Sequence, residues 1–325
     1  MKVLFLSRTP LAGMPWRTSE VCHSRLIKEG GYFHSVVGVD RYGQRVFPTD
    51  WPADLAAKHA SEADLFILTA HYAAREHTSP GRILQDNPDT PRAMHFSIEP
   101  SHWANTEWSS DDCTVSAQYH WRFAQHLDPL PNCIPIDNPM FMPEKKPDDR
   151  VVIVYAPSTK KERGWGNKGY GKTTFILSQL CHKYGDDIEV VLLFNRPYDE
   201  VMRAKRHAHI VIDECVTGSY HSSALEGMSC GAVTYALVDA RTCDALGKCI
   251  GDEAAMQNLP IQSESIVSLK ESIEVLIECP SMLTGLGRMS REWMENHYSE
   301  EWQARKWIEW HRAFLDRCKK GALTK

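Results

Sequence analysis

The sequence lacks a long apolar run, an excess of positive charge and a paired cysteine motif, and each absence excludes a class of protein. No apolar stretch approaches the ~20 residues of a membrane-spanning helix. The formal net charge of −5 gives no global field that attracts nucleic acid or anionic lipid. The ten cysteines contain no C-x-x-C pair and the histidines show no zinc-site spacing, so we expect a cytoplasmic protein with reduced cysteines and no structural metal.

The chain does contain short β-branched runs that alternate with amphipathic segments. This pattern is typical of an α/β protein in which helices join parallel strands. Strands are expected at 2–6, 35–39, 64–69, 92–98, 113–117, 133–137, 151–157, 189–194, 209–214 and 232–238. Helices are expected at 17–29, 171–185, 198–208, 265–278, 281–298 and 300–318. The first run is too short for a signal peptide and is interpreted as a buried strand.

A stretch rich in proline and charge, at 139–150, divides the chain into two halves and is predicted to be a linker. The halves are an N-terminal Rossmann-like domain at 1–138 and a second one at 151–299. The C-terminal helix at 300–325 is long enough to cross back onto the first domain. Two such sheets are expected to face a cleft at the carboxyl ends of their strands, where ligands of open α/β sheets bind.

One short motif favours an alternative function. The residues from Gly166 to Thr173, GNKGYGKT, match the phosphate-loop pattern G-x-x-x-x-G-K-[S/T], and the strand at 209–214 ends in two acids that could hold Mg²⁺. A phosphate loop follows its strand directly, whereas eight residues separate Pro157 from Gly166. A P-loop nucleoside triphosphatase therefore stays an alternative rather than the main interpretation.

Longer stretches point elsewhere. GSYHSSALEGMSCGAVTYAL (218–237) places a glutamate before a glycine and an apolar strand. YAPSTKKERGWGNKG (155–169) is a strand end with a basic, glycine-containing loop, and RPYDEVMRAKRHAHIVIDEC (196–215) is a helix followed by a strand. In the first half, LFLSRTPLAGMPWRTSE (4–20) has a glycine after the first strand, and CIPIDNPMFMP (133–143) leads into the linker. Together these stretches resemble the retaining GT-B glycosyltransferases of the group 1-like family.

The resemblance implies a nucleotide-diphosphate sugar as donor, with no cofactor and no metal. Fixed cations and helix N-termini would then stabilise the charge that grows on the departing diphosphate. The implied donor-binding residues are Gly13, Arg17, Lys160, Lys168, Ser222, Ser223 and Glu226. Among them, Glu226 matches the family glutamate that accepts hydrogen bonds from ribose hydroxyls.

One position departs from the family pattern. The family has two glutamates spaced E-x₇-E, and Gly218 stands where the first glutamate, which contacts the donor sugar, is expected. Glu214 lies four residues earlier, and a shifted loop could bring it in. The departure leaves the identity of the sugar open and keeps a third interpretation, a non-catalytic nucleotide- or glycan-binding protein of the same fold.

The first domain is expected to hold the acceptor. The catalytic candidates follow strands at the expected cleft edge: His71, Glu99 and His102. The sequence does not choose among them. A saccharide or lipid-linked glycan is the family's usual acceptor, and a hydroxymethylated DNA base is a less usual one. The prediction is thus a glycosyltransferase that transfers a sugar to a hydroxyl with retention at the anomeric carbon.

Overall fold

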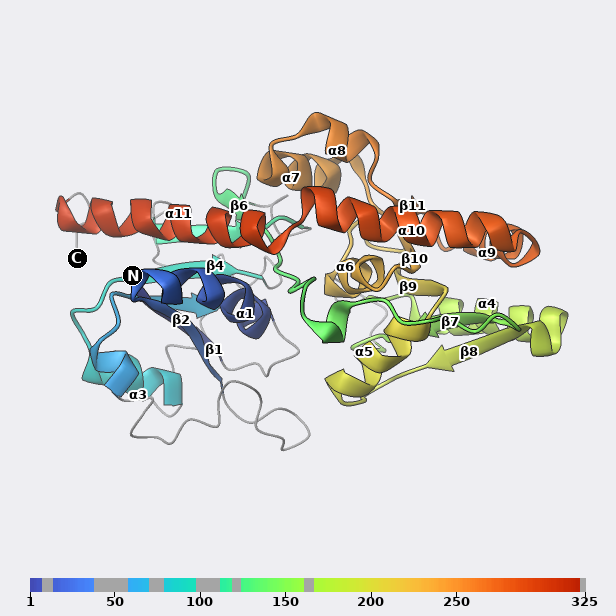
Figure 1. Cartoon of the computed structure of the whole chain (residues 1–325), viewed down its shortest axis with the longest axis horizontal. Helices are drawn as coiled ribbons and strands as arrows, with labels where there is room; N and C mark the ends of the chain where they lie inside the picture. Colours follow the sequence, from blue (N-terminus) through green and yellow to red (C-terminus); the bar gives the residue numbers. More distant parts are fainter. Residues whose placement is uncertain are drawn as a thin grey trace. The chain divides into compact units, whose positions relative to one another are not determined.

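The computed structural model describes residues 1–7, 14–37, 58–69, 79–97, 112–118, 124–160 and 167–321 of the chain. The chain divides into two compact units, Met1–Pro135 with Glu300–Lys325, and Ile136–Ser299. Each unit is a parallel sheet with helices against its faces, which is the predicted α/β class (Figure 1). In this division the C-terminal helix belongs to the first unit, and 139–150, the expected linker, belongs to the second.

The sheet of the first unit has the strand order β2-β1-β3-β4-β5-β6, and every described pairing in it is parallel. Its strands are β1 Lys2–Ser7, β2 Tyr32–Val37, β3 Leu65–Thr69, β4 Arg92–Phe96, β5 Cys113–Ser116 and β6 Asp128–Leu130. Its helices are α1 Met14–Leu26, η1 Ile27–Glu29, α3 Ser79–Asp86 and α11 Glu300–Lys319. The order β2-β1-β3 requires crossovers on both sides of β1, as in a doubly wound sheet.

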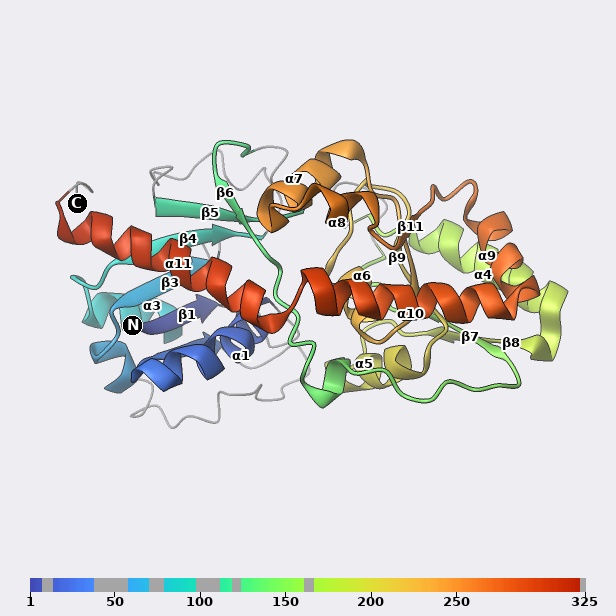
Figure 2. The ribbon, with the colours of Figure 1, turned by 45° about the horizontal axis from the view of Figure 1, so that its top comes forward.

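Both faces of this sheet are buried, which explains the unbroken apolar run of β1. Val3 and Phe5 pack with α1 and α11 on one face. Leu4 and Leu6 pack with α3 on the other, and Figure 2 shows the two layers of helices. Strands that are covered on both faces are hydrophobic at every position rather than at alternate positions.

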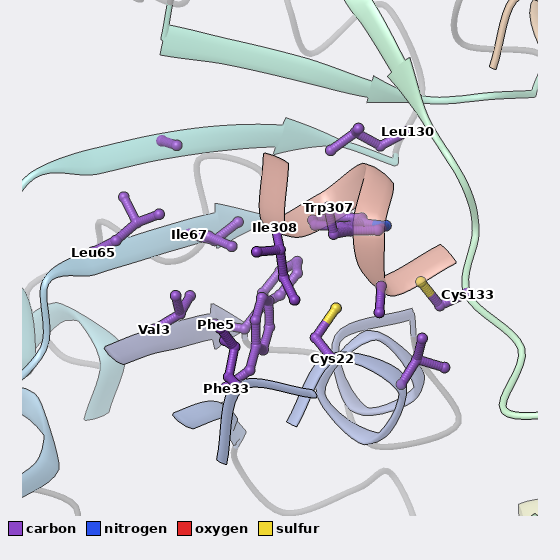
Figure 3. Packing of buried hydrophobic residues seen from close by; sticks show 14 of the residues in the cluster. Val3, Phe5, Cys22, Phe33, Leu65, Ile67, Leu130, Cys133, Trp307 and Ile308 are labelled. Carbon is purple, nitrogen blue, oxygen red and sulfur yellow. The ribbon is translucent and has the colours of Figure 1, made fainter. Parts of the chain in front are cut away.

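The C-terminal helix α11 supplies the centre of one of these cores. Trp307 is fully buried, with its ring 5.9 Å from that of Phe5, and Figure 3 shows Trp307 and Ile308 within the cluster. The indole Nε1 of Trp307 donates to the carbonyl of Pro131 at 3.0 Å. Trp307 and the half-buried Trp310 thus form an aromatic face of α11 that packs into this core.

The strand expected at 133–137 is absent, and the reason is local. Pro131 and Pro135 cannot donate to a sheet. The backbone of Ile134 instead bonds to a side chain of α11: its N–H donates to Gln303 Oε1 at 2.7 Å, and its carbonyl accepts from Gln303 Nε2 at 2.8 Å. Among the described residues, the sheet therefore ends at β6, which precedes this segment in the sequence and pairs with β5.

The sheet of the second unit has the order β11-β10-β9-β7-β8, again with parallel pairings. Its strands are β7 Val151–Tyr155, β8 Ile188–Leu192, β9 Ile210–Glu214, β10 Val233–Ala236 and β11 Ile261–Ser263. Its helices are η6 Pro139–Phe141, α4 Tyr170–Tyr184, η7 Gly185–Asp187, α5 Tyr198–His207, α6 Ser222–Ser229, α7 Ala240–Ile250, α8 Glu253–Gln257, α9 Leu269–Glu278 and α10 Pro280–His297. None of the helices in the described ranges is long and apolar enough to span a membrane.

The segment expected to be a linker is bound to the rest of the second unit by several contacts, among them Arg206 of α5 with Pro139 and Arg291 of α10 with Phe141. Arg291 Nη1 donates to the carbonyls of Ile136 at 3.1 Å, Phe141 at 3.4 Å and Ser229 at 2.9 Å. Asn138 also caps the short helix η6 by accepting from the N–H of Met140. Buried carbonyls that would otherwise lack partners are thus satisfied by a charged donor, which orders the segment.

Candidate functional site

The carboxyl edge of the second sheet holds three buried charged residues, Lys168, Asp213 and Glu214. Strands β7, β9 and β10 run parallel, so their carboxyl ends lie at one edge, where ligands of open α/β sheets bind. The chain leaves β7 at Tyr155 and returns at Lys168, whose carbonyl accepts a 2.7 Å hydrogen bond from the Tyr155 hydroxyl. Gly169, with φ +63°, then begins α4. This return places Lys168 beside the end of β9.

Lys168 forms a buried ion pair with Asp213 at the end of β9. The Nζ atom lies 3.7 Å from Asp213 Oδ1, and the two side chains are 9% and 2% exposed. Burial lowers the pKa of Lys168 to about 8, although the carboxylates of Asp213 and Glu214 oppose this. Burial would raise the pKa of Asp213, but Lys168 and His221 outweigh it and hold that pKa well below its usual range. The pair is therefore ionised at neutral pH.

His221 joins this pair at the start of α6. It is the N-cap residue of the helix, and its backbone N–H donates to Asp213 Oδ2. Its imidazole Nδ1 lies 3.4 Å from the same oxygen. Burial and the nearby Lys168 lower the pKa of His221, so the ring is neutral near pH 7. One carboxylate thus links the strand end, the loop lysine and the helix start.

The neighbouring Glu214 does not take the place of the missing family glutamate. Its Oε2 accepts from the backbone N–H groups of Val216 at 2.7 Å and Thr217 at 2.8 Å, and its Oε1 bonds to the Thr217 hydroxyl. The side chain therefore holds its own turn. Gly218 has φ +82°, a left-handed conformation in which a glutamate would be strained. The departure from E-x₇-E thus has a backbone cause.

Glu226 lies in a second buried network. Its Oε2 is 2.6 Å from Lys205 Nζ, and its Oε1 accepts from the Tyr198 hydroxyl at 2.8 Å. Lys205 also donates to Ser223 Oγ at 2.8 Å. The network ties α5 to the first turns of α6, and Ser222, also in the first turn, is half-buried. Sequence reasoning missed Lys205 and Tyr198. The available signal was helical spacing: Lys205 follows the apolar Met202 by three residues, so both lie on one face of α5, and both are buried.

Two other predicted residues have contacts of their own in the structure. Lys160 is exposed, with its Nζ 4.7 Å from the ring centre of Tyr170 and 4.4 Å from that of Phe194. Arg17, in the first unit, is 1% exposed, and its Nε donates to the carbonyl of Cys133 at 2.8 Å. Arg17 therefore anchors the segment after β6. The remaining predictions, Gly13, His71, Glu99 and His102, lie outside the described residues.

The described part of the GNKGYGKT stretch does not support a phosphate loop. Strand β7 ends at Tyr155 and α4 begins only at Tyr170, so the strand does not lead directly into a helix. The motif lysine, Lys172, is exposed, whereas Lys168 pairs with the acid at the end of β9. Gly166 lies outside the described residues. Within the described ranges, no three His, Cys, Asp or Glu side chains come together to hold a metal ion.

Comparisons with known proteins identify the fold. No protein-family model matches the sequence, and no curated protein matches it significantly. An α-glucosyltransferase solved with UDP and a 13-mer DNA containing an HMU base is similar in structure, with a TM-score of 0.62 and 8% identity, over 95% of this chain and 99% of that one. Sucrose-phosphate synthase from Thermosynechococcus elongatus gives 0.54 and 10%, over 97% and 99%.

A third similar structure is the O-GlcNAc transferase of Thermobaculum terrenum, with a TM-score of 0.51 and 12% identity, over 99% of this chain and 69% of that one. All three are glycosyl-transferring or sugar-synthesising enzymes by name, and the likeness spans both units of the chain. The chain therefore has the GT-B fold. The fold class predicted from the sequence is confirmed.

Proposed function

We propose that this chain is a glycosyltransferase that moves a sugar from a nucleotide-diphosphate sugar to an acceptor hydroxyl. The GT-B fold supports this function, and one observation carries it: a buried lysine, Lys168, at the carboxyl edge of the second sheet, next to the N-terminus of α6. Negative charge grows on the diphosphate as its bond to the sugar breaks. A desolvated cation and the N–H groups of a helix start stabilise such charge.

The other donor-binding residues follow from this placement. The backbone N–H groups of Ser222 and Ser223, in the first turn of α6, are proposed to bind phosphate oxygens. Glu226 is proposed to accept from ribose hydroxyls, because a carboxylate can accept two hydrogen bonds from a diol. With these fixed charges the reaction needs no metal, and activity is expected to survive EDTA.

The acceptor and the stereochemistry are proposals of a finer kind. We favour a saccharide or lipid-linked glycan, with retention at the anomeric carbon and one of His71, Glu99 or His102 facing the sugar. A hydroxymethylated DNA base is the second candidate. It is supported by the likeness in fold and length to the α-glucosyltransferase solved with an HMU-containing DNA.

The test is a donor and acceptor panel on the full chain. Release of UDP, GDP or ADP from the corresponding nucleotide-diphosphate sugars is measured in the presence of glycan acceptors, of HMU-containing duplex DNA and of unmodified duplex DNA. Lys168→Ala is expected to lower turnover at least ~100-fold. Lys172→Ala is the matched control, because it removes an exposed lysine from the same stretch and is expected to change nothing.

The alternatives make opposite predictions. A non-catalytic binding protein would bind a nucleoside diphosphate without turnover of any donor sugar. A P-loop enzyme would hydrolyse ATP with Mg²⁺ and lose that activity in Lys172→Ala. Either result would overturn the proposal. Anomeric configuration of the product, determined by NMR, tests retention separately.

A further inference from the structure

The carboxylate of Asp213 is placed where simple electrostatics would not put it. A buried carboxylate beside a diphosphate site repels the ligand, and the repulsion is strong away from water. Yet Asp213 is 2% exposed and lies 3.7 Å from the lysine that is proposed to bind the diphosphate. Its other oxygen binds the backbone N–H of His221 and faces the imidazole at 3.4 Å. Such a group is retained where it positions other donors.

We propose that His221 is a second diphosphate-binding side chain, that Asp213 positions His221 and Lys168 together, and that His221 takes up a proton from solvent when the diphosphate binds. The proposal rests on the proposed function, since it concerns the same donor site. Neither Asp213 nor His221 belongs to the donor-binding residues that the sequence resemblance implied. They come from contacts that only the fold brings together.

The geometry determines which ring nitrogen does what. Nδ1 lies 3.4 Å from the carboxylate oxygen Asp213 Oδ2, so we assign the proton of the neutral ring to Nδ1 and the acceptor role to Nε2. An acceptor repels a phosphate oxygen. When Nε2 also gains a proton, both nitrogens become donors: Nδ1–H to Asp213 and Nε2–H to the diphosphate. The two negative charges of the ligand favour that protonated state.

The charged groups around the ring set the balance. Burial and the Lys168 cation from the loop before α4 disfavour imidazolium, while Asp213 and Glu214 of β9 favour it. Lys168 itself faces the same two carboxylates and also Lys205 of α5. A bound diphosphate adds negative charge to this set. The pKa of His221 is therefore expected to rise above the pH of a neutral solution when the diphosphate binds.

Proton uptake is measured by isothermal titration of UDP, GDP and ADP, at about pH 7, in buffers of different ionisation enthalpy. The wild type is expected to take up close to one proton per bound nucleotide. His221→Asn is expected to abolish the uptake and to weaken binding about 10-fold. Lys168→Arg keeps a permanent cation and is expected to retain the uptake, which separates His221 from the lysine.

The sign of a second variant is decisive. Asp213→Asn removes a negative charge and keeps an oxygen that can accept from the His221 N–H. Simple repulsion predicts tighter binding, whereas the positioning role predicts binding about 10-fold weaker and a smaller proton uptake. His209→Asn is the matched control, because His209 is a half-buried histidine next to the amino end of β9, away from Asp213 at its carboxyl end. Melting temperatures identify any variant that fails to fold.

The outcomes separate this inference from the proposed function. Diphosphate binding and sugar transfer without His221-dependent proton uptake would overturn the inference alone. Binding with His221-dependent uptake, but without transfer of any sugar, would overturn the glycosyltransferase and leave the site. Tighter binding by Asp213→Asn would overturn the positioning role, and no binding of any nucleoside diphosphate would overturn both.

Discussion

Among the described residues of the second unit, two buried lysine–carboxylate pairs differ in how closely their charged atoms approach. Lys205 and Glu226 are 2.6 Å apart, and Tyr198 and Ser223 complete the bonding. In the other pair the charged atoms of Lys168 and Asp213 are 3.7 Å apart, longer than a hydrogen bond. Both pairs bear on the same short helix, α6. The closer pair, Lys205–Glu226, joins that helix to α5. The more distant pair, Lys168–Asp213, places charge beside the N-terminus of the helix.

The difference separates two uses of buried charge. Desolvation of two ions costs several kcal/mol, and only close, well-bonded geometry repays it. The Lys205–Glu226 pair has that geometry, so its role is structural even if Glu226 also binds ribose. The Lys168–Asp213 pair has a longer separation, and burial lowers the pKa of Lys168 to about 8. On the proposed function, a bound diphosphate would favour the charged form of this lysine.

The largest expected effect comes from breaking the closer pair. Lys205→Met leaves Glu226 buried without its cation and is expected to lower the free energy of unfolding by about 3–5 kcal/mol. Urea unfolding measures this. Adding Glu226→Gln to the same chain is expected to restore part of the loss. As a control, Lys183→Met removes a half-exposed lysine that pairs with Glu274 and is expected to lower the free energy of unfolding far less.

Breaking the more distant pair is expected to have the opposite profile. Lys168→Met leaves Asp213 buried beside His221 alone, but it breaks a longer pair than Lys205→Met does, so the free energy of unfolding should fall by less than in Lys205→Met. Nucleoside diphosphate affinity should fall about 10- to 100-fold, because the main cation of the site is gone. Unfolding and titration on the same preparation give both values. Equal stability losses for Lys168→Met and Lys205→Met would remove the distinction.

A smaller effect concerns pH. The folded pKa of Lys168 is about 8, against an ordinary 10.5, so between these values the unfolded chain binds more protons than the folded one. The stability of the wild type relative to Lys168→Met should therefore rise from about pH 8 to about pH 10.5. Nucleotide affinity should fall over the same range as the lysine loses its charge. A stability difference that stays flat with pH would contradict this.

The smallest effect tests an exposed lysine for contrast. Lys160 lies over the rings of Tyr170 and Phe194, in contact with solvent. Lys160→Ala is expected to cost about 0.5–1 kcal/mol of stability. Nucleotide affinity should change less than 3-fold, a difference well below that expected for the buried lysine. A loss of affinity comparable to that of Lys168→Met would mean that both lysines reach the diphosphate.

Much of the fold followed from period and composition, because parallel strands covered on both faces are unbroken apolar runs. Strand β9 was expected at 209–214 and lies at Ile210–Glu214, and α5 was expected at 198–208 and lies at Tyr198–His207. Helix α7 was missed. Its signal was present, since Asp239 caps it by accepting from the N–H of Thr242, but a cap next to a strand end resembles a turn.

The site was predicted less completely, for a physical reason. Lys168 was identified from a loop motif, and the structure places it at the sheet edge. Its partners Asp213 and His221 are distant in sequence, and no local pattern reports a contact between a loop and the end of another strand. The left-handed φ of Gly218 is likewise invisible in one sequence. The roles of the predicted donor residues stay predictions.

The bonds of Gln303 and Arg291 have a consequence for how the two units are strung together. Gln303 binds the backbone of Ile134 within the first unit, and Arg291 binds the carbonyl of Ile136 within the second. The outgoing crossing is thereby shortened to a single proline, Pro135, whose ring already restricts one of its two torsions.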